Sequence, residues 1–288
     1  MKQTHTAKGA ALMLASSILF SMMAVLIKYA SGIDSYKITL FRFIVGLALL
    51  GTAAMFGKIK LTFTHGPFLF LRGLVGSIAV FIFYLSIPKL GLGKATVIGY
   101  CFPIFASIFS RIFLKEKITI VKTAAILTAF VGIYLLTTSG IAGPSLAAAF
   151  GKYELLAVFG AVLGGIAVVL IKKLHDTDSS YAIFFAQCAI GLWLLIVPAT
   201  VVPSDIGYSA VVLLLSIGVT AAVGQLLMTQ GYNYVSVTTG SLLGMLTPVL
   251  NYVIGVMIFH ELISIRSVIG SVVIIACCVV VLLANDKS

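Results

Sequence analysis

The acidic residues are the first place to look for chemistry in this sequence, because a carboxylate inside a membrane can carry a proton, hold sodium or bind a metal. The chain has eight acidic residues, and each lies at the end of an apolar run or in a connecting loop. They are Asp34, Glu116, Glu154, Asp176, Asp178, Asp205, Glu261 and Asp286. This placement argues against carboxylate-coupled symport, an aspartyl intramembrane protease and a carboxylate-liganded metal enzyme. We therefore predict no catalytic residue, metal site or cofactor.

Two further reactive groupings also favour structural roles. His260-Glu261 begins like a zinc-protease motif, but Ser264 stands where the second histidine should be. Glu116 and Glu261 are expected to anchor helix ends or form salt bridges. The cysteines lie inside apolar runs without metal-like spacing, which favours small packing residues. They are Cys101, Cys188, Cys277 and Cys278.

Two Gly-x-x-x-Pro segments, Gly99 to Pro103 and Gly244 to Pro248, lie near the middle of the fourth and ninth apolar runs. Proline has no N–H to donate to the carbonyl oxygen four residues earlier, so the two glycine carbonyls should lack their usual helical partner. At membrane depth, such backbone is tolerated only against protein or a watery cavity. The pattern predicts either a pair of kinked helices that line a cavity or two packing kinks, and the sequence favours neither.

Polar side chains near these segments are candidates for substrate binding. By helical spacing, the proline face continues through Ser107 in the fourth run and through Asn251 and Tyr252 in the ninth. An asparagine at membrane depth should face the protein interior. The candidate substrate-binding residues are Ser17, Ser21, Tyr84, Tyr100, Pro103, Ser107, Gln225, Pro248, Asn251 and Tyr252.

Several of these candidates have an equally ordinary structural explanation. Ser17 and Ser21 lie on a stripe of small residues, and close helix packing is the favoured explanation for them. Tyr84, Tyr100 and Gln225 could be polar handles in an apolar cavity, or side chains that form hydrogen bonds in the core or at lipid level. The tyrosine rings could also hold a cationic or aromatic solute.

Arg42 and Arg72 are the candidate charge partners for a substrate. Arg42 lies roughly 9 Å into the second apolar run and should face the protein interior. A structural hydrogen bond to backbone is favoured over attraction of a substrate anion. Arg72 lies near the end of the third run, where its side chain could simply extend to the lipid headgroups.

The elements that must position these residues are membrane-spanning helices. Of the 288 residues, 61% are hydrophobic and 9% are charged, which is far more apolar surface than one soluble core can hide. None of the apolar runs alternates like a strand of an outer-membrane barrel, so each should be a helix. The fold class is an all-α integral membrane protein with ten helices, near 9–30, 36–56, 68–88, 92–114, 119–138, 153–172, 179–199, 208–231, 236–259 and 264–284.

The net charge of +11 is best explained by orientation rather than by nucleic acid, because the basic residues sit at helix ends. If the N-terminus is inside, twelve basic residues lie at cytoplasmic ends and six at the other side. The twelve are Lys2, Lys8, Lys58, Lys60, Arg72, Arg111, Lys115, Lys117, Lys122, Lys172, Lys173 and Lys287, and the six are Lys28, Lys37, Lys89, Lys94, Lys152 and Arg266. Both termini are therefore predicted to be cytoplasmic, in a multi-pass protein of the cell (inner) membrane.

The second half of the chain repeats the first. The tetrapeptide VLIK occurs at 25–28 and 169–172, and a shift of 145 residues aligns less common residues. The pairs include Tyr36 with Tyr181, Arg42 with Gln187, Gly46 with Gly191, Gly73 with Gly218, Gly99 with Gly244, Pro103 with Pro248 and Glu116 with Glu261. Five helices per repeat bring the second copy to the opposite face, so the halves, 1–140 and 141–288, should be inverted. Inverted repeats are typical of secondary transporters.

With ten predicted helices in two repeats, the sequence resembles the EamA-like branch of the drug/metabolite transporter superfamily. The resemblance covers essentially the whole chain. The residues that carry it include Leu71-Arg72-Gly73-Leu74, Gly93-Lys94-Ala95-Thr96, Leu114-Lys115-Glu116-Lys117-Ile118, Gln230-Gly231-Tyr232, Thr247-Pro248 and Phe259-His260-Glu261. The resemblance implies a ten-helix carrier of small organic solutes, often an exporter of amino acids or related metabolites, with a central cavity walled by both halves.

These observations predict a secondary transporter that moves a small amphipathic metabolite, an amino acid or related solute, by alternating access. An exchanger of organic anions or nucleoside-type metabolites that uses Arg42 or Arg72 is the alternative. A membrane enzyme lacks a visible catalytic constellation, and the short loops leave little surface for a scaffold. The expected partners are a small organic substrate and the lipid bilayer, with no nucleic acid, in a monomer or weak homo-oligomer.

Overall fold

Helices dominate the protein because apolar segments in a bilayer must satisfy their backbone internally. The structure, a computed structural model, describes residues 2–30, 32–90, 92–138, 151–201, 207–260 and 263–285. The helices within these ranges are α1 (Lys2–Tyr29), α2 (Ser35–Met55), α3 (Gly66–Leu90), α4 (Leu92–Gly99), α5 (Phe102–Phe113), α6 (Ile120–Thr138), α7 (Lys152–Leu174), α8 (Ser180–Val201), α9 (Tyr208–Tyr234), α10 (Val237–Gly244), α11 (Leu246–Phe259) and α12 (Ile265–Asn285).

Ten helical segments of the described chain are long and apolar enough to cross a membrane. Each coincides with one of the apolar runs predicted from the sequence. The fourth span consists of α4 and α5, and the ninth consists of α10 and α11, whereas each remaining span is a single helix. The predicted all-α fold with ten membrane spans is therefore confirmed.

Local residues set several helix ends. Asp34 begins α2, because its side chain accepts a hydrogen bond from the N–H of Tyr36 at 2.7 Å. Ser236 begins α10 in the same way, with the N–H of Thr239 at 3.2 Å. Gly57, just after α2, has φ of +67°, a backbone conformation that glycine adopts without steric cost.

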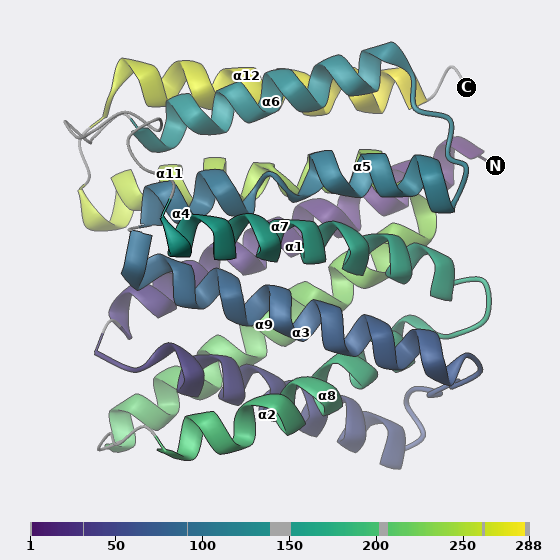
Figure 1. Cartoon of the computed structure of the whole chain (residues 1–288), viewed down its shortest axis with the longest axis vertical. Helices are drawn as coiled ribbons and strands as arrows, with labels where there is room; N and C mark the ends of the chain where they lie inside the picture. The colour runs from purple at the N-terminus through teal and green to yellow at the C-terminus, as the bar shows by residue number, and fades with distance from the viewer. Residues whose placement is uncertain are drawn as a thin grey trace.

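The two ends of the chain lie at one face of the bundle. α1 begins and α12 ends on the right of Figure 1, as an even number of spans requires. We call this side the terminal face. α6 packs beside α12 at one end of the long axis, and α2 packs beside α8 at the other (Figure 1).

The two halves are interleaved rather than side by side. α1 packs on α9 and α3 packs on α7, so that each half contributes one helix to each of these pairs. Likewise, α2 packs on α9 and α3 packs on α8, and these two pairs are counterparts when the halves are exchanged. This is the contact pattern of two repeats related by a pseudo-twofold axis, because such an axis maps every contact onto its counterpart in the other half.

Close glycine contacts between α2 and α8 follow the pseudo-twofold residue by residue. A Cβ added at Gly46 would collide with the sulfur of Cys188. The repeat counterparts of these residues are Gly191 and Phe43, and a Cβ added at Gly191 would collide with the ring of Phe43. Small residues that bring helix backbones together are typical of membrane interfaces.

A second pair of contacts obeys the same relation. A Cβ at Gly73 of α3 would collide with the side chain of Ile190 of α8. The counterparts are Gly218 of α9 and Val45 of α2, and a Cβ at Gly218 would collide with Val45. These reciprocal contacts support the duplication and place the repeats in inverted order.

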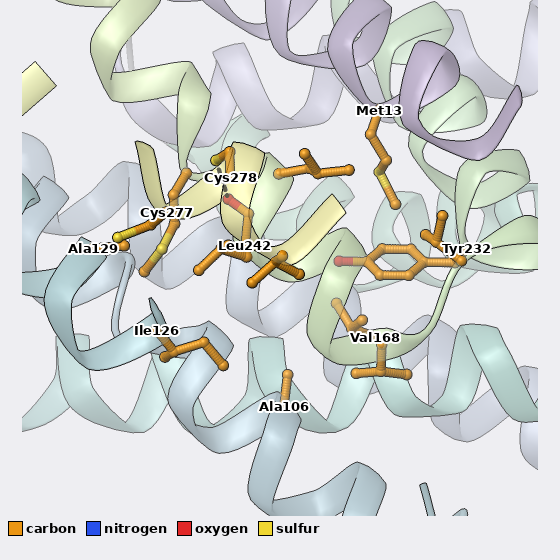
Figure 2. Packing of buried hydrophobic residues seen from close by; sticks show 14 of the residues in the cluster. Met13, Ala106, Ile126, Ala129, Val168, Tyr232, Leu242, Cys277 and Cys278 are labelled. Carbon is orange, nitrogen blue, oxygen red and sulfur yellow. Dashed lines mark hydrogen bonds between the residues drawn. The ribbon is translucent and has the colours of Figure 1, made fainter. Parts of the chain in front are cut away.

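The largest buried cluster draws on both halves. Met13 of α1, Tyr232 of α9 and Leu242 of α10 lie together in it (Figure 2). Cys277 and Cys278 of α12 belong to the same cluster, as the predicted apolar packing residues. Around the predicted site, the bundle is therefore held by dense packing between the repeats.

Candidate functional site

The two proline-bearing spans are interrupted at equivalent positions. At the first break, the N–H of Cys101 donates to the carbonyl oxygen of Ile98 at 3.1 Å, and at the second, the N–H of Met245 donates to that of Leu242 at 2.9 Å. Both bonds join residues three apart, so the chain makes a tight turn before the helix resumes. Each proline then lies in the first turn of the new helix, where its missing N–H is tolerated. The predicted kinks are therefore helix breaks.

The two breaks lie against each other. The ring of Phe102, at the start of α5, is 4.0 Å from the position of a Cβ added at Gly244, at the end of α10. The side chain of Tyr100 lies close to the side chain of Thr247. Ser21 of α1 donates from its hydroxyl to the carbonyl oxygen of Thr247 at 3.4 Å. The first, fourth and ninth spans thus meet at one polar junction.

The predicted serines form hydrogen bonds along their own helices. The Ser21 hydroxyl also donates to the carbonyl oxygen of Ser17 at 2.8 Å, and the Ser107 hydroxyl donates to that of Pro103 at 2.8 Å. All four residues are buried. Their local hydrogen bonds fit the packing explanation, but each hydroxyl retains lone pairs that could accept a hydrogen bond from a ligand.

Asn251 and Tyr252 differ, although they are adjacent in sequence. Asn251 is half-buried one turn beyond the buried Pro248, and its Oδ1 is sealed from solvent without a hydrogen-bond partner among the described residues. The hydroxyl of Tyr252 instead accepts a hydrogen bond from the N–H of Ser264 at 3.2 Å, which ties the end of α11 to the segment before α12. The structure therefore places Asn251 near the break and gives Tyr252 an anchoring contact.

Arg42, Tyr84 and Gln225 form a buried cluster between α2, α3 and α9. Nη1 of Arg42 donates to the hydroxyl of Tyr84 at 2.9 Å, and Nη2 donates to Oε1 of Gln225 at 2.8 Å. The Tyr84 hydroxyl then donates to the sulfur of Met23 at 3.2 Å. The sequence favoured a bond from Arg42 to backbone. The guanidinium pairs with side chains instead, because the Tyr84 hydroxyl and the Gln225 amide oxygen lie within reach of its two terminal nitrogens.

Arg72 is buried in the bundle and does not extend to the headgroups. Its side chain is 2% exposed, and Nη2 donates to Oε1 of Gln187 at 3.0 Å. The guanidinium folds over Gly76 of its own helix, where an added Cβ would overlap Nη1. The hydroxyl of Ser77 donates to the carbonyl oxygen of Gln187 at 3.0 Å. The headgroup interpretation was wrong because Gly76 leaves space for the side chain to turn inward.

The two arginine clusters lie at symmetry-related interfaces, but the arginine comes from non-equivalent helices of the two pairs. In the first, Arg42 of α2 bonds to Gln225 of α9; in the second, Arg72 of α3 bonds to Gln187 of α8. Gln187 is the repeat counterpart of Arg42. The sequence paired Gln187 with Arg42 in the repeat but did not indicate its hydrogen-bond partner, since Arg72 has no polar counterpart in the repeat. Met23 and Thr247 were also missed, because an isolated methionine or threonine in an apolar run has no distinguishing signal.

Glu116 is a helix anchor, as predicted. Its Oε1 accepts a hydrogen bond from the N–H of Val237 at 3.0 Å, at the start of α10. Nearby, Nζ of Lys172 donates to the carbonyl oxygens of Tyr232 and Val235, each at 3.0 Å, at the end of α9. Glu261, the repeat counterpart of Glu116, lies outside the described residues.

Two hollows lie on the described part of the bundle, and the second borders Ser77 of the Arg72 cluster. One of about 400 Å³ is lined by α9 alone, and one of about 270 Å³ lies between α2, α3 and α8. Their lining residues are Val212, Leu215, Ser216, Val219 and Thr220 for the first, and Tyr36, Ser77, Ile78, Phe81, Leu194, Leu195 and Pro198 for the second. Neither set includes a predicted site residue.

Comparisons with known proteins agree with this architecture. The chain is 26% identical to the pseudopaline exporter CntI of Pseudomonas aeruginosa, over 94% of both proteins. It is 29% identical to solute carrier family 35 member G1 of Mus musculus, over 62% of this chain and 50% of that protein. A crystal structure described only as that of a protein shares the fold, with a TM-score of 0.82, 17% identity and 98% of both chains covered.

A family model also matches each half of the chain. The model describes the EamA-like transporter family and matches residues 7–138 and 151–283. The matched proteins are transporters rather than enzymes, as predicted from the placement of the acidic residues. With both halves matched, the chain belongs to the EamA-like transporter family.

Proposed function

We propose that this membrane transporter is a secondary carrier that moves a small amphipathic organic metabolite, an amino acid or related solute, by alternating access. Export or exchange is the proposed mode. The observation that carries the proposal is the meeting of two symmetry-related helix breaks at the junction between the repeats. Interrupted helices at the interface of inverted repeats are typical substrate sites of secondary transporters. The similarity to an exporter, which covers 94% of that protein's length, adds support for export.

The geometry supports a rocking mechanism. In each half, α5 or α11 begins at a helix break, and we propose that it pivots there. If the repeats exchange conformations about the pseudo-twofold, the junction of Tyr100, Thr247 and Ser21 would open alternately to the two faces. Pro103, Ser107, Pro248 and Asn251 would then border the substrate pathway.

The same proposal includes orientation. The excess of basic residues at one side supports placing the terminal face in the cytoplasm of a cell (inner) membrane protein. A reporter fused to either end should be active inside the cell. Reproducible labelling of either end from outside would contradict this orientation. A monomer or weak homo-oligomer is proposed, because the pseudo-twofold already lies within one chain.

The acidic residues bear on energy coupling. Those in the described part of the chain lie at helix ends or in loops, so we propose facilitated diffusion or exchange rather than proton symport. Accumulation against a substrate gradient, driven only by an imposed proton gradient, would contradict this proposal.

A second candidate function is exchange of organic anions or nucleoside-type metabolites through Arg42 or Arg72. The specific observation is that both guanidinium groups are buried, and no ion pair joins either to an acidic residue among the described residues. Uptake and counterflow in proteoliposomes, screened over amino acids, nucleosides and organic anions, would test both candidates. Carrier function predicts that an unlabelled substrate inside speeds entry of its labelled form. Uptake without such acceleration would contradict carrier function.

A further inference from the structure

Arg72 has more hydrogen-bonding capacity than the protein uses. Its side chain is 2% exposed, and it donates from Nη2 to Gln187. Nε and Nη1 are sealed from solvent and have no partner within the described residues. Buried guanidinium N–H groups are normally paired, because an unpaired donor loses its bonds to water without replacement.

The charge of Arg72 is also uncompensated by the described chain. No ion pair joins Arg72 to any acidic residue that the structure describes. Arg42 is close enough to repel it electrostatically. A buried charge without a partner is strongly unfavourable, and an arginine cannot relieve the cost by losing its proton. The site therefore favours an anion from outside the chain.

Two donors converge over Gly76. A Cβ built at Gly76 would overlap Nη1 of Arg72 and lie 3.2 Å from Nε2 of Gln187. The bond from Arg72 to Oε1 fixes the amide so that Nε2 remains a donor, and the bond from Ser77 holds the backbone carbonyl of Gln187. The absent side chain of Gly76 thus leaves a recess that the guanidinium of Arg72 fills beside the amide N–H of Gln187, and this pair of donors suits a carboxylate.

We propose that Arg72 and Gln187 bind an anionic group, a carboxylate, of the transported metabolite. This inference rests on the proposed carrier function and narrows its substrate class. Arg42 is a structural residue, because Tyr84 and Gln225 accept from both of its terminal nitrogens and only its Nε lacks a partner among the described residues.

The test is thermal stabilisation of the purified full-length protein by matched pairs of small metabolites. Each pair is an amino acid or organic acid and its amide, which differ in the charge of one group. The variants are Arg72→Gln, Arg72→Lys and Arg111→Gln, the last of which removes an exposed arginine at the end of α5. Sodium chloride and sodium sulfate serve as probes for simple inorganic anions.

Stabilisation by carboxylates but not by their amides is expected for the wild type and Arg111→Gln. The half-maximal concentration should rise roughly tenfold or more in Arg72→Gln, as expected for loss of charged hydrogen bonds. Arg72→Lys should retain weaker binding because it keeps the charge but loses the planar fork. If Arg72→Gln fails to fold, the comparison of Arg72→Lys with the wild type decides the result.

The proposal is overturned if no carboxylate stabilises the wild type more than it stabilises Arg72→Gln. It is also overturned if carboxylates and amides stabilise the wild type equally, or if only the inorganic anions stabilise it. The carrier function is judged separately by counterflow. Counterflow of a neutral or cationic metabolite that survives Arg72→Gln would sink the carboxylate site and leave the carrier intact. Carboxylate binding through Arg72 without counterflow would support the carboxylate site and contradict the carrier function.

Discussion

The Arg42 and Arg72 clusters are built on symmetry-related helix pairs, yet they differ in how completely the guanidinium is paired. Arg42 donates to Tyr84 and Gln225, and the Tyr84 hydroxyl in turn donates to the sulfur of Met23. Arg72 donates to Gln187 and leaves both Nε and Nη1 without a partner in the described chain, whereas Arg42 leaves only Nε. The duplication therefore preserved the helix packing while the polar contents of the two interfaces diverged.

This difference separates two uses of a buried charge. A guanidinium whose hydrogen bonds join three helices strengthens the bundle, and its loss leaves the partners unsatisfied. A guanidinium with spare donors contributes less to the fold and can pair with a ligand. Stability and ligand binding should therefore respond in opposite ways to the same substitution at the two arginines.

The largest expected effect is on stability at the first cluster. Arg42→Gln should lower the free energy of unfolding by about 2–4 kcal/mol, because the buried groups of Tyr84 and Gln225 lose their partner. Arg72→Gln should change it by less than about 1 kcal/mol, because removal of an unpaired charge offsets the lost bond to Gln187. Thermal unfolding of both variants in one detergent measures the contrast. Equal losses at the two sites would remove the distinction between the clusters.

Gly76→Ala tests the recess at the second cluster. The new methyl group overlaps Nη1 of Arg72, so the guanidinium must move and weaken its bond to Gln187. We expect a loss of about 1–3 kcal/mol in unfolding free energy from overpacking. Gly51→Ala is the matched control, since nothing lies within 4 Å of its added Cβ. A Gly76→Ala protein as stable as the control would show that the recess is roomier than described.

Tyr84→Phe should make the first cluster more like the second. The substitution removes the hydroxyl that accepts from Arg42 and leaves Nη1 unpaired. The expected loss is about 1 kcal/mol, and it should nearly disappear in an Arg42→Gln background. A double-mutant cycle measures this coupling. Additive effects would mean that the 2.9 Å contact contributes nothing to stability.

His175, just after α7, is a half-buried base that can lose its proton, which neither arginine can do. Burial is the main reason that its pKa falls to about 4, with the charge of Lys172 acting in the same direction. The ring is therefore neutral in the folded protein at pH 7, and its nitrogens lie 2.8 Å from the Ile171 carbonyl oxygen and 2.9 Å from the Ser180 hydroxyl.

The unfolded chain takes up a proton at His175 below its ordinary pKa of 6.5, whereas the folded protein does so near 4. Stability should therefore fall as pH drops through this window, and the loss should be complete below about pH 4. His175→Gln should flatten this part of the curve of stability against pH. An unchanged slope in the variant would assign the acid sensitivity to other groups.

The broad fold could be predicted because each membrane span is determined by the residues of its own segment. Apolar runs of membrane length fixed the ten spans, and the 145-residue shift located the repeat through scattered glycines and prolines. The Gly-x-x-x-Pro pattern located both helix breaks, since proline removes a specific backbone donor. These signals depend on length, periodicity and single-residue chemistry, which can be followed in one sequence.

The side-chain pairings could not be predicted in the same way. Tyr84 and Gln225 were selected as separate polar candidates, but their shared partner Arg42 depends on which faces of α2, α3 and α9 meet. The inward turn of Arg72 depends on the space above Gly76. Such contacts arise from tertiary packing between distant spans, and one sequence without aligned relatives contains no direct record of them.

The central claim is that the two helix breaks border the substrate pathway, and cysteine accessibility tests it most directly. Ser107→Cys and Asn251→Cys would be made separately in a protein whose native cysteines are replaced, with activity confirmed by counterflow. Lys58→Cys in the exposed α2–α3 loop is the positive control, and Ser267→Cys, at a fully buried position of α12, is the negative control.

If the breaks border the pathway, cysteines 107 and 251 should react with a water-soluble thiol reagent more slowly than cysteine 58, and a transported substrate should protect them. Cysteine 267 should stay unlabelled. If cysteines 107 and 251 remain as unreactive as cysteine 267 in active protein, the breaks are sealed packing junctions and the proposed pathway is wrong.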